Sequence, residues 1–309
     1  MSRKFRRPVH GILLLDKPQG LSSNQALQAA RRLYRAAKAG HTGSLDPMAT
    51  GLLPLCFGEA TKVAGWLLGS RKAYEAECLL GVTTSTDDAE GEVRQRQPLP
   101  PLEEGVLRKA LQAFTGTIEQ VPPAFSALKR DGVPMYVRAR RGEDVHLEAR
   151  RVEIHAIELL DWQSPRLRFR VTCGSGTYVR SLARDLGEAL GCGAHLTALR
   201  RLWVDPFTAP AMHALETVEA LAPANRDLLL LPVDAGLQAL PAVHLDAAAT
   251  LAMSHGQGVE RTNLEEGRYR AYADDGRLLA LAERRSDGLL HVLRGFNLPE
   301  NALRAGPEA

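Results

Sequence analysis

Apolar positions near the start of the chain predict a strand followed by a helix. Residues 9–15 form a short apolar run that is typical of a buried strand. Ser22 and Gln25 have the spacing of a capping box, so a helix is expected from there to about Lys38, and Gly40 is placed to end it. The helix positions expected to face inward are Leu27, Ala30, Leu33, Tyr34 and Ala37.

The middle of the chain alternates between strand and helix patterns. Residues 72–82 alternate apolar and polar positions, as a half-buried strand does. Residues 102–114 have helical spacing, and 151–160 and 166–173 have the pattern of two further strands. A helix is expected to begin near Thr177, because leucines follow a glycine break at helical spacing.

Two polar segments have neither pattern. The acidic segment 83–92 resembles a calcium loop in composition, but its spacing does not match an EF-hand, so a solvated loop is expected. The segment 120–145 is rich in proline and basic side chains, which is typical of a binding loop, although an exposed connector has the same composition. Its basic residues are Lys129, Arg130, Arg138, Arg140 and Arg141.

The end of the chain predicts a small separate domain. An apolar linker around 228–240 precedes two hairpin sequences, Asp275-Gly276 and Asp287-Gly288, with an apolar run between them. Three short strands in a meander, and hence a small β-barrel, are therefore expected. The predicted boundaries are 1–240 for the main domain, with an insertion at about 120–150, then 241–300 for the small domain and 301–309 for a tail.

Composition narrows the class of protein. A chain of 309 residues can bury a sizeable core. The four cysteines are widely spaced, without a Cys-x-x-Cys or Cys/His cluster, so no zinc site or other metal is expected. No apolar run approaches the ~20 residues of a membrane span, and the basic start is followed by too short an apolar stretch for a secretory signal. A cytoplasmic protein is expected.

Charge is distributed unevenly. Residues 1–72 contain 12 Lys and Arg against three acidic residues, a balance of +9, so the remainder carries −6 of the total of +3. A basic first part suits a ligand with a phosphate backbone. A solvated basic face has the same composition, and charge alone does not separate these two interpretations.

The segment 40–51 holds the strongest chemical indication in the chain. Asp46 precedes Pro47, which biases it to an extended conformation, and Gly43 and Gly51 permit turns on either side. The nearest acidic residues in the sequence are 30 residues upstream and 13 downstream. A lone carboxylate fixed in a loop suits nucleophilic chemistry better than hydrolysis by paired carboxylates.

A glycine break before the last helix of the main domain superficially suggests a nucleotide loop. Gly174-Ser175-Gly176 precedes that helix, but Val179 stands where the dinucleotide fingerprint has its third glycine, and no P-loop lysine follows. No nucleotide cofactor, and no other cofactor, is therefore expected.

Several ordered motifs resemble one protein family. The segment Gly40 to Gly51 is similar to the catalytic motif of the TruB family of tRNA pseudouridine-55 synthases. The similarity covers roughly residues 10 to 210. It continues through Gly11–Pro18, Gly20–Ser23, Gly58–Lys62, Lys72–Tyr74, Gln120–Lys129, Gly174–Leu182, Gly193–Leu196 and Leu199–Arg201.

The resemblance implies a fold and an activity. The fold would be α+β: a mixed, mostly antiparallel sheet with flanking helices, plus a small C-terminal PUA-like β-barrel that extends RNA contact. The activity would be isomerisation of uridine to pseudouridine at position 55 in the T-arm loop of tRNA. The partner would be the T-arm stem-loop, and the protein a monomer.

The resemblance also assigns catalytic residues. Asp46 matches the catalytic nucleophile, and Arg180 matches the arginine that pairs with it; a guanidinium there would lower the pKa of the carboxyl group. From the sequence alone, Arg180 could instead be a surface cation of a helix. Whether the aspartate attacks carbon or removes a ribose proton stays open.

Further positions match residues that contact the substrate. Tyr74 matches a tyrosine that stacks on the target base, Tyr178 a position lining the uracil pocket, and Leu199 a position contacting the base. His41 matches a residue that enters the space left by the flipped nucleotide. Without the resemblance, Tyr74 and Leu199 would be interpreted as ordinary core residues, and His41 as a histidine with a structural role.

Basic residues in the matched regions are possible contacts to the RNA backbone. Lys17 could equally hold the turn beside Pro18. The possible contacts are Lys17, Lys62, Lys129, Arg130, Arg138 and Arg141. Two other classes of protein stay open: a non-catalytic RNA-binding module with the same basic surface, and a carboxylate-dependent nucleoside or glycoside hydrolase.

Overall fold

The computed structural model describes residues 6–67, 71–126, 128–130, 132–143 and 147–299. The chain forms two compact units, which are described separately. The first contains residues 1–45, 53–68 and 210–309, and the second contains 46–52 and 69–209. Strand β3 (Thr50–Phe57) passes from the second unit into the first. The tail predicted at 301–309 lies outside the described residues.

The first unit contains two groups of elements. Its N-terminal and linker elements are β1 (Gly11–Lys17), α1 (Ser23–Tyr34), β2 (Ala39–His41), η1 (Gly58–Lys62), η2 (Ala64–Leu67), β13 (His213–Ala214), α5 (Leu215–Ala220), α6 (Pro223–Arg226), η3 (Asp227–Leu229) and η4 (Ala235–Leu237). Its C-terminal elements are β14 (Ala242–His244), α7 (Ala247–Ser254), β15 (Val259–Glu260), β16 (Gly267–Tyr272), β17 (Leu278–Arg284) and β18 (Leu289–Gly295).

The predicted first strand and the start of the first helix are confirmed. Strand β1 is buried along most of its length and runs parallel to β13. Ser22 caps α1, and its side chain and that of Gln25 satisfy each other's backbone N–H groups in a complete capping box. Two donors that a bare helix start would leave unpaired are thus satisfied.

The predicted end of this helix is wrong. Helix α1 ends at Tyr34, four residues before Lys38, because Arg35 adopts the left-handed conformation with a φ of 51°. Its N–H then bonds back to the carbonyls of Arg31 and Arg32, which closes the last turn as a terminal glycine commonly does. Ala37 is consequently exposed rather than inward-facing.

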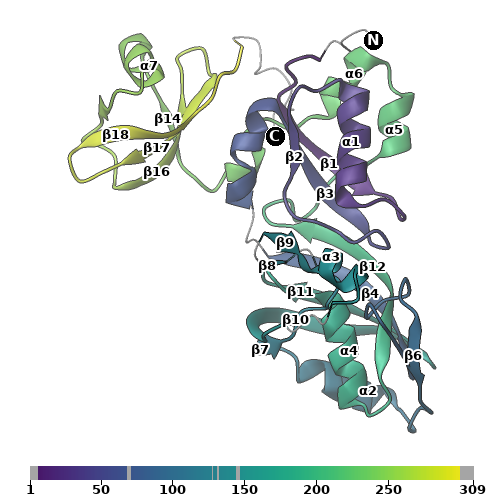
Figure 1. The fold of residues 1–309 in the computed structure, drawn as a ribbon. Helices are drawn as coiled ribbons and strands as arrows, with labels where there is room; N and C mark the ends of the chain where they lie inside the picture. The colour runs from purple at the N-terminus through teal and green to yellow at the C-terminus, as the bar shows by residue number, and fades with distance from the viewer. Residues whose placement is uncertain (1–5, 68–70, 127, 131, 144–146, 300–309) are drawn as a thin grey trace. The chain divides into compact units, whose positions relative to one another are not determined.

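The C-terminal elements form a five-stranded curled sheet in the order β14-β16-β17-β18-β15. The predicted hairpins are confirmed: Asp275-Gly276 lies between β16 and β17, and Asp287-Gly288 between β17 and β18. Figure 1 shows these three strands side by side. The sheet has two strands more than predicted, since β14 and β15 are too short to show periodicity. Its core includes Tyr269 and Leu290.

The second unit carries the larger part of the main sheet. Its elements, besides the start of β3, are β4 (Lys72–Leu80), β5 (Val82–Thr84), β6 (Val93–Arg96), α2 (Glu104–Gln112), β7 (Gly116–Gln120), β8 (Lys129–Arg130), β9 (Val133–Pro134), α3 (Met135–Arg140), β10 (Arg150–Gln163), β11 (Arg166–Cys173), α4 (Val179–Ala189) and β12 (Ala194–Val204).

The sheet of the second unit is mixed and mostly antiparallel, as expected. Its strands follow the order β12-β4-β11-β10-β7, and each neighbouring pair is antiparallel. The start of β3 adds a parallel pairing to β12. Helix α4 contacts β12 and β4, and α2 contacts β10 and α4, so these two helices flank the sheet (Figure 1).

The alternation predicted for residues 166–173 identifies which side chains of β11 belong to the core of this unit. Along β11, Leu167 and Phe169 are fully buried, while Arg166 and Arg170 on the other face pair at 2.7 Å with Glu77 and Glu75 of β4. The exposed pairs add little stability, so the buried face holds the sheet together.

The basic insertion has short regular elements rather than none. It contains the hairpin β8–β9 and the helix α3. No helix in the part of the chain described by the structure is long and apolar enough to cross a membrane.

Candidate active site

The Asp46 loop is a tight turn anchored by apolar neighbours. The N–H of Ala49 donates to the carbonyl oxygen of Asp46 at 3.1 Å, which closes a four-residue turn with Pro47 in second position. Met48 and Ala49 are buried, whereas the side chain of Asp46 is 39% exposed. The turn therefore holds the carboxylate at a fixed place while leaving part of it accessible.

Gly51 joins this turn to the sheet. It has a φ of 97° and lies in register with Arg201 in the parallel pairing of β3 and β12. A Cβ atom at this position would stand 2.1 Å from the carbonyl oxygen of Arg201. Only glycine combines that conformation with so close an approach of two backbones.

Arg180 is buried beside Asp46. The Arg180 side chain is 5% exposed, and its Nε atom forms an ion pair with Oδ2 of Asp46 at 3.0 Å. Its Nη2 atom donates to the carbonyl of Phe125 at 2.9 Å. The alternative of a surface helix cation is therefore wrong. That alternative assumed a solvent-facing side chain at the start of α4, where this one points inward.

A second carboxylate, which the sequence analysis missed, also faces Arg180. Oδ2 of Asp88 lies 3.3 Å from Nη1 of Arg180, and the Asp88 side chain is 4% exposed. Its Oδ1 atom accepts hydrogen bonds from the Thr86 hydroxyl at 2.5 Å and from the backbone N–H of Glu90 at 3.0 Å. The guanidinium is further satisfied by the carbonyl of Thr86 at 3.0 Å.

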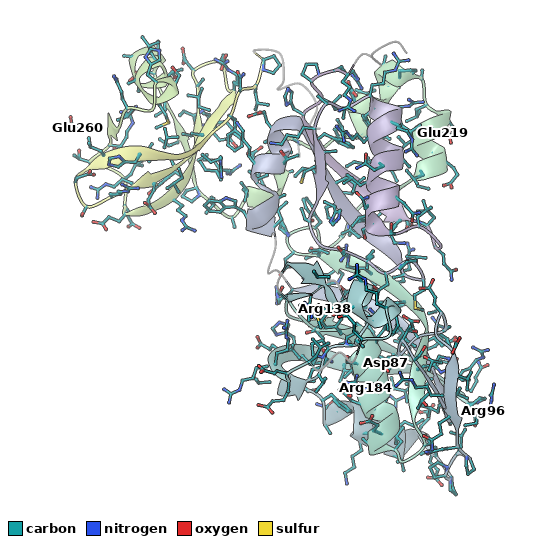
Figure 2. All side chains as sticks on the ribbon, viewed as in Figure 1. Asp87, Arg96, Arg138, Arg184, Glu219 and Glu260 are labelled. Atoms are coloured by element: carbon teal, nitrogen blue, oxygen red, sulfur yellow. The ribbon has the colours of Figure 1, made fainter. Side chains whose placement is uncertain are left out.

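The expectation of a solvated loop at 83–92 is thus wrong for its two aspartates. Asp87 pairs with Arg184 of α4 at 3.1 Å, and both residues are labelled in Figure 2. Burial raises the pKa of Asp87, and Arg184 and then Arg180 oppose that rise. Composition alone favoured solvent exposure of these two aspartates. The sequence does not show that an arginine of α4 lies opposite each carboxylate.

Tyr74 and Arg201 form a buried pair under the same site. They face each other across β4 and β12, and Tyr74 is 8% exposed while Arg201 is fully buried. Burial raises the pKa of the Tyr74 hydroxyl. The charge of Arg201 and its hydrogen bond to that hydroxyl act in the opposite direction, and the Asp46 carboxylate adds to the rise. Nε of Arg201 also donates to the carbonyl of Leu52 at 2.7 Å.

Tyr178 precedes α4 and is positioned by a glutamine. Its backbone N–H donates to Oε1 of Gln120 at 2.8 Å, and its carbonyl accepts from Nε2 of the same side chain at 3.1 Å. Burial raises the pKa of Tyr178, and the neighbouring Ser126 side chain acts against that rise. Weaker effects come from nearby charges that include Asp46. Both tyrosines therefore lie within electrostatic reach of the carboxylate.

Leu199 lies on the sheet face that carries Tyr74. It pairs with Ala76 on β4, two positions from the Tyr74–Arg201 pair, and opposed residues two apart share a face. Its carbonyl accepts from the Thr50 hydroxyl at 3.5 Å. The second unit thus brings together Asp46, Tyr74, Leu199 and the pair Tyr178 and Arg180 from four separate segments.

Three predicted site residues, His41, Lys17 and Lys62, belong to the first unit. His41 ends β2 opposite Leu55 and is half-buried. Lys17 has no exposed surface, and its ammonium donates to the carbonyls of Pro18 at 2.9 Å and Leu21 at 2.5 Å. The burial of Lys17 therefore favours a role in holding the turn over a contact with phosphate.

The other basic positions differ in their surroundings. Lys62 is held by Glu59 and by the carbonyl of Gly295. Arg138 and Arg141 lie 3.9 and 3.8 Å from Glu143. The side chains of Lys129 and Arg130 lie outside the described residues, although their backbone forms β8.

The arrangement defines the chemistry available in the second unit. A partly exposed carboxylate is paired with a buried guanidinium, beside a buried aromatic ring. Within the described ranges, no group of three or more His, Cys, Asp or Glu side chains is placed to hold a metal ion. The pair can present a fixed negative charge to a bound substrate, and a planar group of that substrate could lie against the aromatic side chains.

Comparison with known proteins connects this arrangement to an enzyme class. The family model "TruB family pseudouridylate synthase (N terminal domain)" matches residues 31–179. "tRNA pseudouridylate synthase B C-terminal domain" matches 180–238, and "Pseudouridine synthase II TruB, C-terminal" matches 241–296.

Individual proteins are similar along nearly the whole chain. A tRNA pseudouridine synthase B of Xanthomonas campestris pv. campestris is 58% identical over 94% of this chain and 95% of its own length. The protein of the same name from Xylella fastidiosa is 55% identical over 96% and 99%. A solved chain in the structure of an H/ACA RNP bound to a substrate RNA containing 2′-deoxyuridine has the same fold. Its TM-score is 0.69 at 23% identity, covering 94% of this chain and 86% of that one.

The fold and these matches define the class: the protein is a pseudouridine synthase, and hence an isomerase. Within that class, the chain belongs to the TruB family of pseudouridylate synthases.

Proposed function

We propose that this enzyme converts uridine to pseudouridine at position 55 in the T-arm loop of tRNA, with Asp46 as the nucleophile. The ion pair of Asp46 with buried Arg180 is the observation that carries this proposal. The relatives that are 55% to 58% identical are named tRNA pseudouridine synthase B, which supports tRNA as the substrate.

The reaction moves one bond without any redox change. The bond from N1 of uracil to the ribose breaks, the base turns, and C5 bonds to the same sugar carbon. C5 loses a proton to solvent and N1 gains one. Attack of the carboxylate on carbon and removal of a ribose proton both require ionised Asp46. Arg180 stabilises that charged form at 3.0 Å.

The detached base has to stay near the sugar until it rejoins. We assign this task to Tyr74, by stacking, and to Tyr178 and Leu199, as further walls around the uracil. Tyr74 and Leu199 share one sheet face, and both tyrosines lie within electrostatic reach of Asp46. Such an enclosure keeps the base in reacting geometry and excludes water.

A uridine in a folded RNA loop reaches such a pocket only by leaving its stack. Extrusion costs a few kcal/mol. We assign to His41, at the end of β2, the role of occupying the space that the nucleotide leaves. His41 is therefore a binding residue and carries no proton in the reaction.

The remaining assignments concern partners and organisation. We propose that the protein acts as a monomer in the cytoplasm, where tRNA is modified. The curled sheet formed by residues 242–295 would be a PUA-like RNA-binding domain, separated from the main domain near residue 240. Arg138 and Arg141 of the insertion would contact the RNA backbone.

Incubation with an unmodified tRNA transcript tests this proposal. Pseudouridine should form at position 55 and at no other position, and a transcript with cytidine there should stay unmodified. Release of free uracil without pseudouridine would identify a hydrolase instead, and binding without any chemistry would identify an RNA-binding module.

A further inference from the structure

The amide side chain of Gln120 is buried against the start of helix α4. Gln120 is the last residue of β7, and its backbone pairs with Arg150 of β10. Only 1% of the residue is exposed. A buried amide is costly unless both its oxygen and its nitrogen have hydrogen-bond partners, so the partners of this one indicate its role.

Both ends of the amide bond to a single residue, Tyr178. Oε1 accepts from the backbone N–H of Tyr178 at 2.8 Å, and Nε2 donates to the carbonyl oxygen of Tyr178 at 3.1 Å. Residues of neighbouring antiparallel strands exchange two bonds in the same way. Tyr178 is accordingly extended, with a φ of −105° and a ψ of 111°. One side chain therefore fixes the peptide groups on both sides of Tyr178.

Helix α4 depends on this contact because no side chain caps its first turn. Tyr178 is the N-cap residue, where Ser, Thr, Asp or Asn is usual. Its carbonyl accepts the first helical bond, from the N–H of Leu182 at 3.1 Å, besides the bond from Gln120. Arg180 is the second residue of the helix, so the glutamine contact sets the position of its backbone.

The chain that follows the glutamine binds the same part of α4. The carbonyl of Val121 accepts from the Ser181 hydroxyl at 2.8 Å and from Nη2 of Arg184 at 2.9 Å. The carbonyl of Phe125 accepts from Nη2 of Arg180 at 2.9 Å. The end of β7, the residues after it and the start of α4 therefore form one hydrogen-bonded assembly, which includes the guanidinium of the site.

We propose that Gln120 is a positioning residue for the isomerisation. Its amide holds Tyr178 against the uracil and, through the start of α4, keeps Arg180 at the catalytic carboxylate. The inference rests on the proposed function, which assigns these roles. A neutral amide suits the task because it donates and accepts at once, which an ionised carboxylate cannot do. A displacement of about 1 Å in a catalytic group lowers rates roughly a hundredfold, so a contact outside the reacting atoms can control the chemistry.

The test uses Gln120→Met, which keeps the length of the side chain and removes both hydrogen bonds. The single-turnover rate of pseudouridine formation at saturating unmodified tRNA transcript should fall roughly ten- to a hundredfold. Affinity for the transcript should change less than about threefold, because the substitution removes no side chain assigned to RNA.

Gln120→Glu adds a pH-dependent rescue. An ionised carboxylate cannot donate to the Tyr178 carbonyl, whereas a protonated one donates and accepts as the amide does. Its rate, divided by that of the unaltered enzyme at the same pH, should rise as the pH is lowered from about 8 to about 5.5, because burial favours the protonated form. The relative rate of Gln120→Met should not depend on pH. The charged groups near Tyr178 are Arg150, Arg180 and Asp46, and their own titration cancels in the ratio.

Leu167→Ala is the structural control. Leu167 is fully buried in the same unit and lies in register with Cys78, four positions along β4 from Tyr74. Its truncation destabilises the core without removing a contact of the Gln120 amide. Thermal unfolding is measured for every variant, and rates are compared well below all the midpoints. The single-turnover rate of Leu167→Ala should stay close to that of the unaltered enzyme.

The outcomes separate this inference from the proposed function. The original rate in Gln120→Met overturns the inference, and so does an equal loss in Leu167→Ala, because the glutamine would then contribute only to folding. If Gln120→Met does not fold, Gln120→Glu decides: a relative rate that does not rise as the pH falls overturns the inference. Failure of the unaltered protein to form pseudouridine in tRNA would instead refute the proposed function.

Discussion

Arg180 is the side chain on which the contacts of the site converge. Its guanidinium faces the carboxylates of Asp46 and Asp88 and donates to the carbonyls of Thr86 and Phe125. A planar group with five donors can hold several acceptors in fixed directions, which a lysine cannot. Asp88 is buried and Asp46 is partly open, so Asp88 acts on the reaction through Arg180.

We predict that Asp88→Asn impairs chemistry more than binding. Loss of the charge lets Arg180 shift, and a misplacement of about 1 Å in such a site lowers rates roughly a hundredfold. The single-turnover rate should therefore fall between ten- and a hundredfold, while tRNA affinity changes less than threefold. Rapid-quench measurements of pseudouridine formation, with parallel binding titrations, check both values.

The neighbouring aspartate provides the control. Asp87→Asn removes the carboxylate that pairs with Arg184 rather than with Arg180. It should leave the single-turnover rate close to that of the unaltered enzyme. Equal losses in the two variants would mean that the segment contributes only to folding.

The contrast between these two aspartates shows what sequence can predict at this scale. The resemblance paired Asp46 with Arg180, and the structure places them 3.0 Å apart. Asp88 was missed because neighbouring acidic residues in a polar segment have the same local pattern. Only the packing of α4 against the 84–88 segment decides which of them meets Arg180.

At the scale of elements, the junction of the Asp46 turn with β3 is the most constrained point. Thr50 and Gly51 pair in parallel with Arg200 and Arg201 of β12, about 150 residues away in the sequence. The turn was predictable from glycine and proline. The pairing was not, because β12 itself was not predicted and register depends on contacts distant in sequence.

We predict that Gly51→Ala destabilises the protein and abolishes most activity. A methyl group would stand 2.1 Å from a backbone oxygen, and the positive φ adds strain of about 1–2 kcal/mol. The loss in free energy of unfolding should exceed that strain, because two strands must also separate. Chemical denaturation measures it.

Gly20→Ala is the matched control for that experiment. Gly20 also has a positive φ, 85°, but nothing lies within 4 Å of the added methyl group. This variant should show the strain alone and keep full activity. If both variants lost the same stability, close approach of the two backbones would not matter.

The helix η1 should make the first unit sensitive to acid. Nδ1 of His10 accepts the N–H of Glu59 at 3.1 Å, and burial lowers the pKa of His10. Burial would raise the pKa of Glu59, but Lys62 and the N–H of Asn297 lower it overall. The unfolded chain therefore binds more protons than the folded chain at both groups. Their contributions are present above pH 6.5 and 4.5 respectively and are lost as the pH falls further.

We predict that His10→Gln removes the loss of stability that begins as the pH falls below 6.5. The midpoint of thermal unfolding of the natural protein should fall as the pH decreases below 6.5, and the variant should lose the part of that dependence that begins at pH 6.5. His255→Gln, which removes an exposed histidine, should keep it. Identical pH profiles for the natural protein and His10→Gln would show that His10 does not contribute.

At the scale of the whole molecule, the distribution of charge has the largest consequence for RNA binding. The excess of +9 over residues 1–72 lies almost entirely in the first unit, whose part of this segment has a balance of +8; Asp46, Arg71 and Lys72 of the second unit add only +1. A phosphate-rich substrate would therefore be attracted chiefly to the N-terminal part of the first unit. tRNA binding should accordingly weaken as salt rises.

The sequence predicted the kinds of elements better than their grouping into units. Alternation along 166–173 predicted β11, and the Asp-Gly pairs predicted both C-terminal hairpins. The two compact units combine segments far apart in the chain, which periodicity cannot show because it reports only local environment. The domain boundary near residue 240 stays a prediction.

The role of Asp46 is tested most directly by comparing Asp46→Asn with the unaltered enzyme on the same tRNA transcript. The substitution keeps the size of the side chain and removes the negative charge that Arg180 faces. We predict that pseudouridine formation becomes undetectable while the affinity for tRNA stays within a few-fold of its original value. Pseudouridine formation at the original rate by Asp46→Asn would contradict the central claim that this carboxylate performs the chemistry.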